Sequence, residues 1–422
     1  MNASNESEVM ENRVPTGCLS HVKVLDMSRI FAGPWAGQFF SDLGADVIKV
    51  ELTGRGDDVR QSGPPFLPDR DGNDSRESAQ YLSVNRGKRS ITVDFSKPEG
   101  QEIIRRLAAD SDVLIENYKV GTLKRYNLDY DSIAKVNPRL VYCSITGFGQ
   151  SGPYSHRPGY DMVFQGMSGL MSVTGERDDQ PGGGPQRVGY SSADMSAGMY
   201  AISAILAALL HRDAVSGKGQ YIDLSLLDSQ VSLLSHVAAN YFMTGKVPGR
   251  LGNVSANASP WGAFPCADDS VVIAVGNDEQ FRRLCETMKQ PELASDPLFI
   301  TTPVRVRNRE ALTAILTKSF RTRNAADWVT TLDAAGVPCG PIYNIEQMLQ
   351  DPQVMHRQME VSQAHPLGQS VRSIANPIKF SDTPVVPHRP PPMQGQHTRE
   401  VLAARLTLND AQLDALVAAR II

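Results

Sequence analysis

The sequence has few cysteines, and none of them form a closely spaced pair. The five stand at positions 18, 143, 266, 285 and 339 of the 422 residues, and no C-x-x-C motif occurs. Structural zinc sites and thioredoxin-like redox motifs need closely spaced cysteines or histidines, so we predict neither a metal centre nor a redox motif. Isolated cysteines are typical of a reducing compartment, and we expect a cytoplasmic location.

An excess of positive charge and a membrane-length apolar run are also missing. The chain carries 42 Lys and Arg against 46 Asp and Glu, a net charge of −4. This balance argues against nucleic acid or an anionic membrane as a partner. The longest apolar run, residues 199–210, is too short for the ~20 residues that span a bilayer. The polar, acidic start of the chain resembles no targeting signal, and we predict a disordered arm over residues 1–18.

The first part of the chain alternates strand and helix patterns. Strands are predicted at 21–28, 45–51, 112–118 and 140–145, and helices at 33–44, 97–111 and 130–139. Short helices between strands indicate right-handed parallel crossovers. We therefore predict an α/β fold with a Rossmann-like parallel sheet covered by helices on both faces.

Composition changes mark three further segments. After a long apolar helix at 195–212, a strand and one more helix lead into a Gly-rich stretch, which places a boundary near residue 245. We predict a large domain over 19–245, a smaller α/β domain over 246–335 and a C-terminal segment, 336–422, that returns to the large domain. Its Pro-rich part cannot form helix hydrogen bonds and is predicted to be extended.

The stretch ITGFGQSGPYSHRPGYD, residues 145–161, contains the G-x-G-x-x-G spacing of dinucleotide-binding loops at Gly147, Gly149 and Gly152. Such a loop must open a helix whose N-terminus meets the pyrophosphate. Here Pro153 and Pro158 follow, and no acid closes a second strand about twenty residues later. We therefore predict no nicotinamide cofactor and a loop that backbone or substrate approaches closely.

Asp194 lies where the long apolar helix begins, next to serine, alanine and glycine. One hypothesis is that its carboxylate caps the helix or complements its dipole. The other is that it is a nucleophile towards an acyl group, with small neighbours that admit a bulky reactant. Residue chemistry alone leaves both open.

Several stretches, in order along the chain, carry a family resemblance. These are LDMSRIFAGPWAGQFFSDLGADVIKVE, VNRGKRSITVDF, DVLIENYKVGTLKRY, SITGFGQSGP, GYD, ADMSAG, GVPCGPI and GQHT. Together they resemble the family III CoA-transferases, the CaiB/BaiF type, from about residue 18 to 420. The resemblance implies a coenzyme A thioester as substrate and an interlocked homodimer. It also implies that Asp194 is the catalytic aspartate and that Asp161 supports it.

The same resemblance implies positions for coenzyme A. It assigns Asn117, Arg125 and Ala32 to the CoA site, and Gly147 and Gly149 to the active-site loop, where backbone amides are candidate oxyanion donors. Lys88 and Arg89 are predicted phosphate partners by charge, with an exposed, solvated pair as the alternative.

Within the family, the sequence most resembles enzymes for dicarboxylates, which implies transfer from succinyl-CoA to glutarate. Arg29 suits a second substrate carboxylate through a bidentate bond, or else a structural ion pair. Arg250, in a Gly-rich loop, is predicted to close over the acceptor. Ser255 replaces a histidine of similar enzymes, which leaves the acid open.

Other activities remain as alternatives: transfer to formate, oxalate, malate, citramalate or carnitine-type acids, α-methylacyl-CoA racemisation, or acyl-CoA binding without catalysis. Related racemases carry a histidine at the position of Tyr160. Tyrosine is a weak base at neutral pH, so Tyr160 favours transfer.

Overall fold

The computed structural model describes residues 17–385 and 389–422, and the chain divides into two compact units. Of the described residues, the large unit contains 17–168, 189–236, 355–385 and 389–422, and the small unit contains 169–188 and 237–354. These limits differ from the predicted 245 and 335, because 336–354 includes a strand of the small unit's sheet. Residues 1–16 of the predicted arm lie outside the described part.

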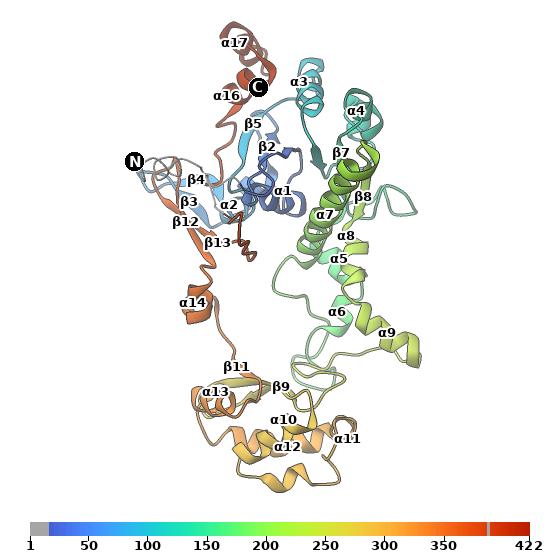
Figure 1. Ribbon diagram of the computed structural model, residues 1–422, viewed down its shortest axis with the longest axis vertical. Coiled ribbons are helices and arrows are strands. Elements are labelled where there is room, and N and C mark those ends of the chain that lie inside the picture. Colours follow the sequence, from blue (N-terminus) through green and yellow to red (C-terminus); the bar gives the residue numbers. More distant parts are fainter. Residues whose placement is uncertain (1–16, 386–388) are drawn as a thin grey trace, which may run out of the picture. The chain divides into compact units, whose positions relative to one another are not determined.

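A six-stranded sheet forms the centre of the large unit (Figure 1). In spatial order its strands are β5 (Arg89–Thr92), β2 (Asp46–Glu51), β1 (Lys23–Asp26), β6 (Val113–Glu116), β7 (Val141–Thr146) and β8 (Tyr221–Ser225). Every neighbouring pair is parallel. The prediction of a parallel sheet built from consecutive crossovers is confirmed.

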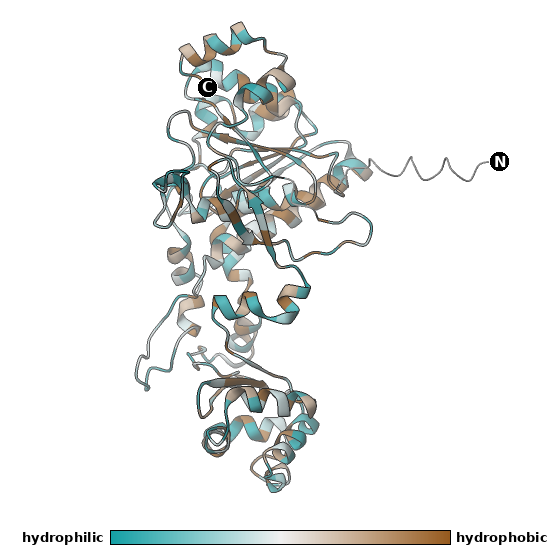
Figure 2. Ribbon diagram, turned by 90° about the vertical axis from the view of Figure 1, so that its left-hand side faces the viewer, coloured by the Kyte–Doolittle hydropathy of each residue, from teal (hydrophilic) through white to brown (hydrophobic). Residues whose placement is uncertain are grey.

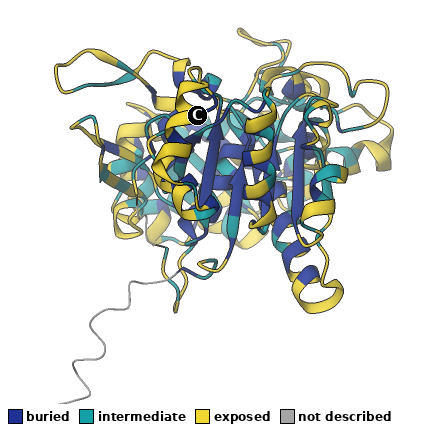
Figure 3. Cartoon of the chain, turned by 90° about the horizontal axis from the view of Figure 1, so that it is seen from above, coloured by how far each residue is buried: buried dark blue, intermediate teal, exposed yellow. Residues whose placement is uncertain are grey.

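Helices cover both faces of this sheet, so its four inner strands, β2, β1, β6 and β7, are buried on both sides (Figure 3). On β1, Val24 belongs to one apolar cluster and Leu25 to the other. The first cluster includes residues of α1 (Ala32–Asp42), α5 (Asp161–Met167), α7 (Ser192–His211) and α8 (Leu226–Ser232). The second includes residues of α3 (Pro98–Ala109), α4 (Tyr130–Val136), α16 (Thr398–Leu406) and α17 (Asp410–Ala418). Continuous Val, Ile and Leu runs are what a sheet of this kind requires, and Figure 2 shows these strands as hydrophobic.

Shorter elements complete the large unit. They are η1 (Asp58–Gln61), β3 (Phe66–Pro68), β4 (Asp74–Ser78), α2 (Ala79–Ser83), η2 (Leu123–Tyr126), η3 (Arg212–Ser216), β12 (Glu360–Ala364) and β13 (Ser370–Ile374). The C-terminal segment returns to the large unit as α16 and α17, and Ile421 and Ile422 end in its core. The Pro-rich stretch has no helix or strand in its described residues, 382–385 and 389–397.

The small unit has a three-stranded antiparallel sheet of its own, in the order β11 (Cys339–Pro341), β10 (Ser270–Ala274), β9 (Trp261–Pro265). Its helices are α6 (Leu170–Val173), most of α9 (Ser235–Thr244), α10 (Asp278–Thr287), η4 (Pro291–Ala294), α11 (Thr302–Arg307), α12 (Arg309–Phe320), α13 (Ala325–Ala334) and α14 (Ile345–Gln350). The short α15 (Pro352–His356) crosses from the small unit to the large one. A separate apolar core holds the small unit together.

By length and apolar composition, the segment Ser192–Ser216 could span a membrane. Half of its most apolar window is buried inside the protein, where α7 packs against α1 and β7. The packing of α7 in the sheet's helical layer accounts for its apolar character.

Candidate active site

A pocket of about 400 Å³ opens at the carboxyl ends of β1, β6 and β7. Arg29, Ile30 and Ala32 follow β1, Asn117 to Val120 follow β6, and Gly147 follows β7. Tyr160 and Asp194 also line it. In parallel α/β sheets this edge is where ligands bind. The pocket therefore brings together residues that are far apart in the sequence.

Asp161, not Asp194, caps the start of α7. Its Oδ1 accepts a hydrogen bond from the Ala193 amide at 2.8 Å, and its Oδ2 accepts one from Gln165 Nε2 at 2.6 Å. Among the described residues, the Asp194 carboxylate has no hydrogen bond of its own. Because Asp161 satisfies the helix N-terminus, the capping hypothesis for Asp194 is not needed.

The environment of Asp194 favours its protonated form. Burial, and then the negative charge of Asp161, raise the pKa of the Asp194 carboxyl to about 7. A carboxylate that is poorly solvated and lacks a partner is a stronger nucleophile than a surface acid. Asp194 therefore ionises near neutral pH with its oxygens open to the pocket.

Asn117 fixes the segment that carries Arg29. Its side-chain Oδ1 accepts from the Arg29 amide at 2.8 Å, and its Nδ2 donates to the Arg29 carbonyl at 2.6 Å. The Arg29 guanidinium lies 4.5 Å from the Tyr118 ring centre and pairs with Asp58 at 3.1 Å through Nη1. Its Nε is buried and finds no hydrogen-bond partner in the described part of the chain. Arg29 thus has unused donor capacity beside the pocket.

The glycine loop turns without starting a helix after Gly152. Residues 151–160 are turns and irregular backbone, and α5 begins only at Asp161. Gly147 lines the pocket, and a Cβ there would lie 2.7 Å from Phe164 Cζ. Gly149 has φ +86°, donates to Thr146 Oγ1 and is outside the pocket lining. The loop therefore lacks the helix N-terminus that binds a pyrophosphate.

The family model for CoA-transferase family III matches residues 19–398. The chain belongs to CoA-transferase family III. The chain is similar to the succinate–glutarate CoA-transferase of Agrobacterium fabrum (strain C58 / ATCC 33970), which is 45% identical over 94% of this chain and 98% of the relative. The human succinyl-CoA:glutarate CoA-transferase is 40% identical over 96% of this chain and 90% of the relative.

Solved structures agree with the family assignment. A CaiB/BaiF family protein from Brucella suis is 43% identical, with a TM-score of 0.82, and the match covers 92% of this chain and 100% of that one. Rv3272 from Mycobacterium tuberculosis is 29% identical with a TM-score of 0.80, covering 91% and 99%. The family and its fold, as predicted from the sequence motifs, are confirmed, and the protein is a CoA-transferase.

The structure contradicts a CoA contact for Lys88. Its side chain is fully buried and its Nζ bonds Asp26 at 2.8 Å, the Pro34 carbonyl at 2.7 Å and Asn85 Oδ1 at 2.8 Å. Burial lowers the pKa of Lys88 to about 8. An ammonium with three protein acceptors has no donor left for a phosphate, so this family III residue is structural.

Arg89 is also occupied by protein partners. Its guanidinium forms a bidentate pair with Asp46 at 2.7 Å and reaches Glu400 of α16 at 3.3 Å. These bonds join β5, β2 and α16. The predicted phosphate contact therefore competes with two ion pairs, and neither the phosphate nor the exposed-pair hypothesis anticipated them.

The other predicted residues lie in different places. Arg125 is exposed on η2, next to a second pocket of about 340 Å³ lined by Leu123 and Lys124. Tyr160 is 74% exposed at the start of α5. Arg250 belongs to the small unit, where it bonds Asp178 and the Ser172 carbonyl. No cluster of His, Cys, Asp or Glu in the described residues could hold a metal ion.

Sequence reasoning missed Tyr118, Lys119, His156 and Arg157, which line the same pocket. The Arg157 guanidinium lies 5.4 Å from the centre of the Phe148 ring and 4.6 Å from the centre of the Tyr154 ring. The aromatic residues near Arg157 in the glycine loop could have indicated from the sequence that this arginine lies at the site. Tyr118 and Lys119 directly follow the matched Asn117, so the motif's spacing could have included them.

Proposed function

We propose that this family III enzyme transfers CoA from succinyl-CoA to glutarate through covalent intermediates on Asp194. The observation that carries the proposal is the Asp194 carboxylate, which lines the pocket without a hydrogen-bond partner in the described residues and has a pKa raised to about 7. The names of the Agrobacterium and human relatives support this substrate pair.

In the first half of the reaction, an Asp194 oxygen attacks the thioester carbonyl and the C–S bond breaks, giving a mixed anhydride and CoA thiolate. The thiolate then attacks the aspartyl carbonyl, which releases succinate and leaves an aspartyl–CoA thioester. Glutarate attacks that thioester, and the released thiolate attacks the glutaryl carbonyl. Glutaryl-CoA leaves and the Asp194 carboxylate is regenerated, with no oxidation or reduction.

Burial serves this chemistry because the first step converts the charged Asp194 carboxylate into a neutral acyl group, and Asp194 stays neutral in both the anhydride and the thioester. Because the site disfavours the ionised form of Asp194, forming the anhydride or the thioester removes the free-energy cost of the buried charge. Asp161 keeps its position by bonding the Ala193 amide and Gln165, and its negative charge adds to that effect. Backbone amides near Gly147 are candidate donors to the developing oxyanion.

The pocket also suits a diacid. Arg29 keeps an unpaired, buried Nε beside the pocket, and a guanidinium binds carboxylates through paired N–H groups. We propose that it binds the carboxylate of succinate or glutarate that does not react. Ala32 and Asn117 would line the CoA path, and the exposed Arg125 would meet its nucleotide end.

The assay that tests the function incubates the purified protein with succinyl-CoA and single acids, and detects new CoA esters by mass spectrometry. Glutarate is expected to give glutaryl-CoA, while formate, oxalate, malate, citramalate and carnitine-type acids give less. If another acid gives more CoA ester than glutarate, glutarate is not the preferred acceptor, but the assignment as a CoA-transferase stands. Binding of CoA with no ester from any acid would overturn transfer, and solvent exchange of an α-hydrogen would indicate a racemase.

Replacing Arg29 tests the diacid contact. Arg29→Gln is expected to raise the KM for glutarate about 10-fold or more, because a charge-assisted, bidentate bond is lost. Arg29→Lys should restore only part of the affinity for glutarate, since lysine binds a carboxylate as a point charge and not through paired N–H groups. Acetate, which has no second carboxylate, is the matched acceptor. An equal loss of activity with both acids would assign Arg29 a general structural role.

We further propose a homodimer of the interlocked type that the family resemblance implies. Helices of the large unit expose large apolar side chains, including Met162 and Met167 on α5, and Met199, Tyr200 and Leu210 on α7. In the small unit, Phe242 is 80% exposed and Met243 is 86% exposed on α9. Exposed apolar groups of this size favour a protein partner, and a second copy is the simplest one.

A further inference from the structure

Ile30 has a backbone conformation that its side chain disfavours. Its φ is +70°, in the left-handed region, although it is a β-branched residue. Such residues adopt this conformation only where surrounding contacts hold them. Ile30 lines the pocket, stands next to Arg29 and is two residues before α1 begins. Its conformation therefore sets how Arg29, in the pocket wall, is oriented relative to the start of α1.

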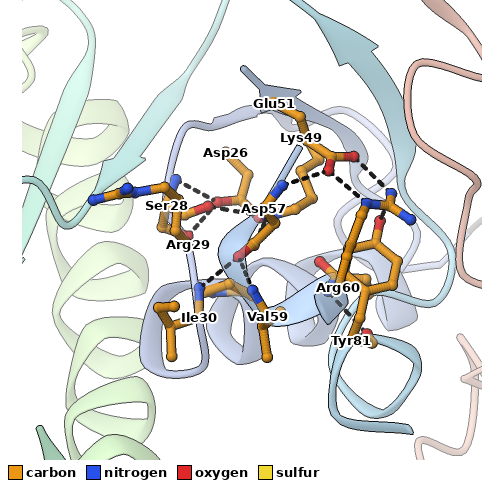
Figure 4. A network of polar contacts seen from close by, with 12 residues as sticks. Asp26, Ser28, Arg29, Ile30, Lys49, Glu51, Asp57, Val59, Arg60 and Tyr81 are labelled. Atoms are coloured by element: carbon orange, nitrogen blue, oxygen red, sulfur yellow. Dashed lines mark hydrogen bonds and ion pairs between the residues drawn. The ribbon is translucent and has the colours of Figure 1, made fainter. Parts of the chain in front are cut away.

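A buried ion pair holds this turn (Figure 4). Asp57 Oδ1 accepts from the Ile30 amide at 3.0 Å and from the Val59 amide at 3.1 Å. Asp57 Oδ2 lies 2.8 Å from Lys49 Nζ, and neither side chain is exposed. Lys49 Nζ also donates to the Ser28 carbonyl at 3.0 Å. The pair thus bonds the backbone on both sides of Arg29.

Other contacts of Asp57 keep the carboxylate in place. Its own amide donates to Glu51 Oε2 at 2.9 Å, and that carboxylate is paired with the buried Arg60 at 2.7 Å. Asp26, which forms an ion pair with Lys88, is a second negative charge near Lys49. The carboxylate therefore has a fixed position from which it can determine the geometry of residue 30.

We propose that Asp57 is a positioning residue for CoA transfer, because its buried carboxylate holds Ile30 in the left-handed conformation that presents Arg29 and the start of α1 to the pocket. This role rests on the proposed function of the pocket. Asp57 itself does not line the pocket and is not expected to touch substrate.

The chemistry of the site makes Asp57→Asn informative. One oxygen of the carboxylate accepts from two backbone amides, and the other forms the ion pair with the Lys49 ammonium. An asparagine has one acceptor oxygen and one NH₂ group, so it must turn its NH₂ towards one of these donors. We expect the Ile30 turn to relax and kcat/KM to fall about 10²-fold, the scale that a misplacement of about 1 Å produces.

Glycine at position 30 separates backbone positioning from general destabilisation. Ile30→Gly and Ile30→Ala both remove the side chain from the pocket, but only glycine adopts φ +70° without strain. With Asp57 present, the two variants should have similar kcat/KM values. In the Asp57→Asn background, the glycine variant is expected to be much more active than the alanine variant, a non-additivity that a double-mutant cycle measures.

Equal activity of the two double variants, or wild-type kcat/KM in Asp57→Asn, would overturn the proposal. Hydrogen exchange of a peptide from Met27 to Gly33 is a readout that does not need transfer: exchange at residue 30 should be faster in Asp57→Asn. If wild type forms no CoA ester, the proposed function fails while this measurement still decides the role of Asp57. Should Asp57→Asn not fold, Asp57→Glu displaces the carboxylate and allows the same glycine and alanine comparison.

Discussion

Asp161, at the start of α5, and Asp194, in the first turn of α7, are the same residue type, but their contacts give them different roles. Asp161 accepts two hydrogen bonds and caps α7, while the Asp194 carboxylate bonds to nothing in the described residues. Sequence reasoning could find both acids and could say that one of two roles applied to Asp194. It could not assign the cap, because α5 and α7 are brought together only by the fold.

The raised pKa of Asp194 predicts a pH dependence of transfer. Only the ionised carboxylate is a nucleophile, so kcat/KM should rise about tenfold per pH unit below the pKa of about 7 and level off above it. Asp161→Asn removes a negative neighbour, which lowers the pKa of Asp194, so the rise should move to lower pH. Initial rates from pH 5 to 9 check this.

Asp194→Asn is the control for that profile. It should keep the fold and CoA affinity but lose covalent transfer, since an amide cannot form the anhydride. Hydroxylamine trapping during turnover, followed by peptide mapping, should label Asp194 in the wild type. Turnover by Asp194→Asn, or a label on another residue, would exclude the nucleophile.

At the scale of elements, the small residues on both sides of Asp194 serve helix packing. The sequence-based hypothesis was that they admit a bulky reactant, but Ala193 and Ala197 belong to the buried cluster shared with α1. Gly198 faces α1, where a Cβ would lie 2.8 Å from Trp35 and 3.0 Å from the Ala32 carbonyl. A helix of this composition lets α1, which carries Ala32 of the pocket, lie close to α7.

Gly198→Ala is therefore expected to destabilise the protein by about 1–3 kcal/mol, because α1 must shift to make room. In an exposed helix interior the same change stabilises by about 1 kcal/mol, so the sign identifies the close contact. Thermal unfolding measures it. Ser203→Ala, on the exposed side of α7, should change stability by less than about 0.5 kcal/mol.

Periodicity located most elements to within a few residues. The helix predicted at 33–44 is α1 at 32–42, and the one at 195–212 is α7 at 192–211. The apolar helix predicted after β8 is instead two helices, α8 and α9, with a break at residues 233–234. Apolar side chains continue through the break, so hydrophobic pattern alone did not reveal it.

At the scale of the whole molecule, the proposed dimer makes a direct prediction. Light scattering after size exclusion should give twice the chain mass of 46.0 kDa at micromolar concentration. Leu210→Glu, on a residue 70% exposed on α7, should shift the protein towards the monomer, because a charge cannot be buried unpaired. Lys318→Glu on α12 is the surface control. A wild-type monomer would contradict the dimer.

The division of the chain into two units agrees only in part with the limits predicted from composition. The small unit takes residues 169–188 as well as 237–354, since Gly252 donates to the Gly175 carbonyl at 3.1 Å and Arg250 bonds the Ser172 carbonyl. Contacts between residues 77 and 78 positions apart leave no compositional mark. The Gly-rich stretch marked a change in structure, but not the boundary itself.

The sequence by itself determined the parallel sheet, the family motifs and the acids at the pocket, because strand and helix periodicity and matched residue types are local properties. Only the tertiary structure decided which charges are free to act. Lys88, Arg89 and Asp57 each carry one charge in the sequence, but the fold pairs each of them with an opposite charge from a strand of the sheet. Asp194 remains unpaired because Asp161 takes the helix cap. Pairing depends on distances between chain segments, and those distances exist only in the folded protein.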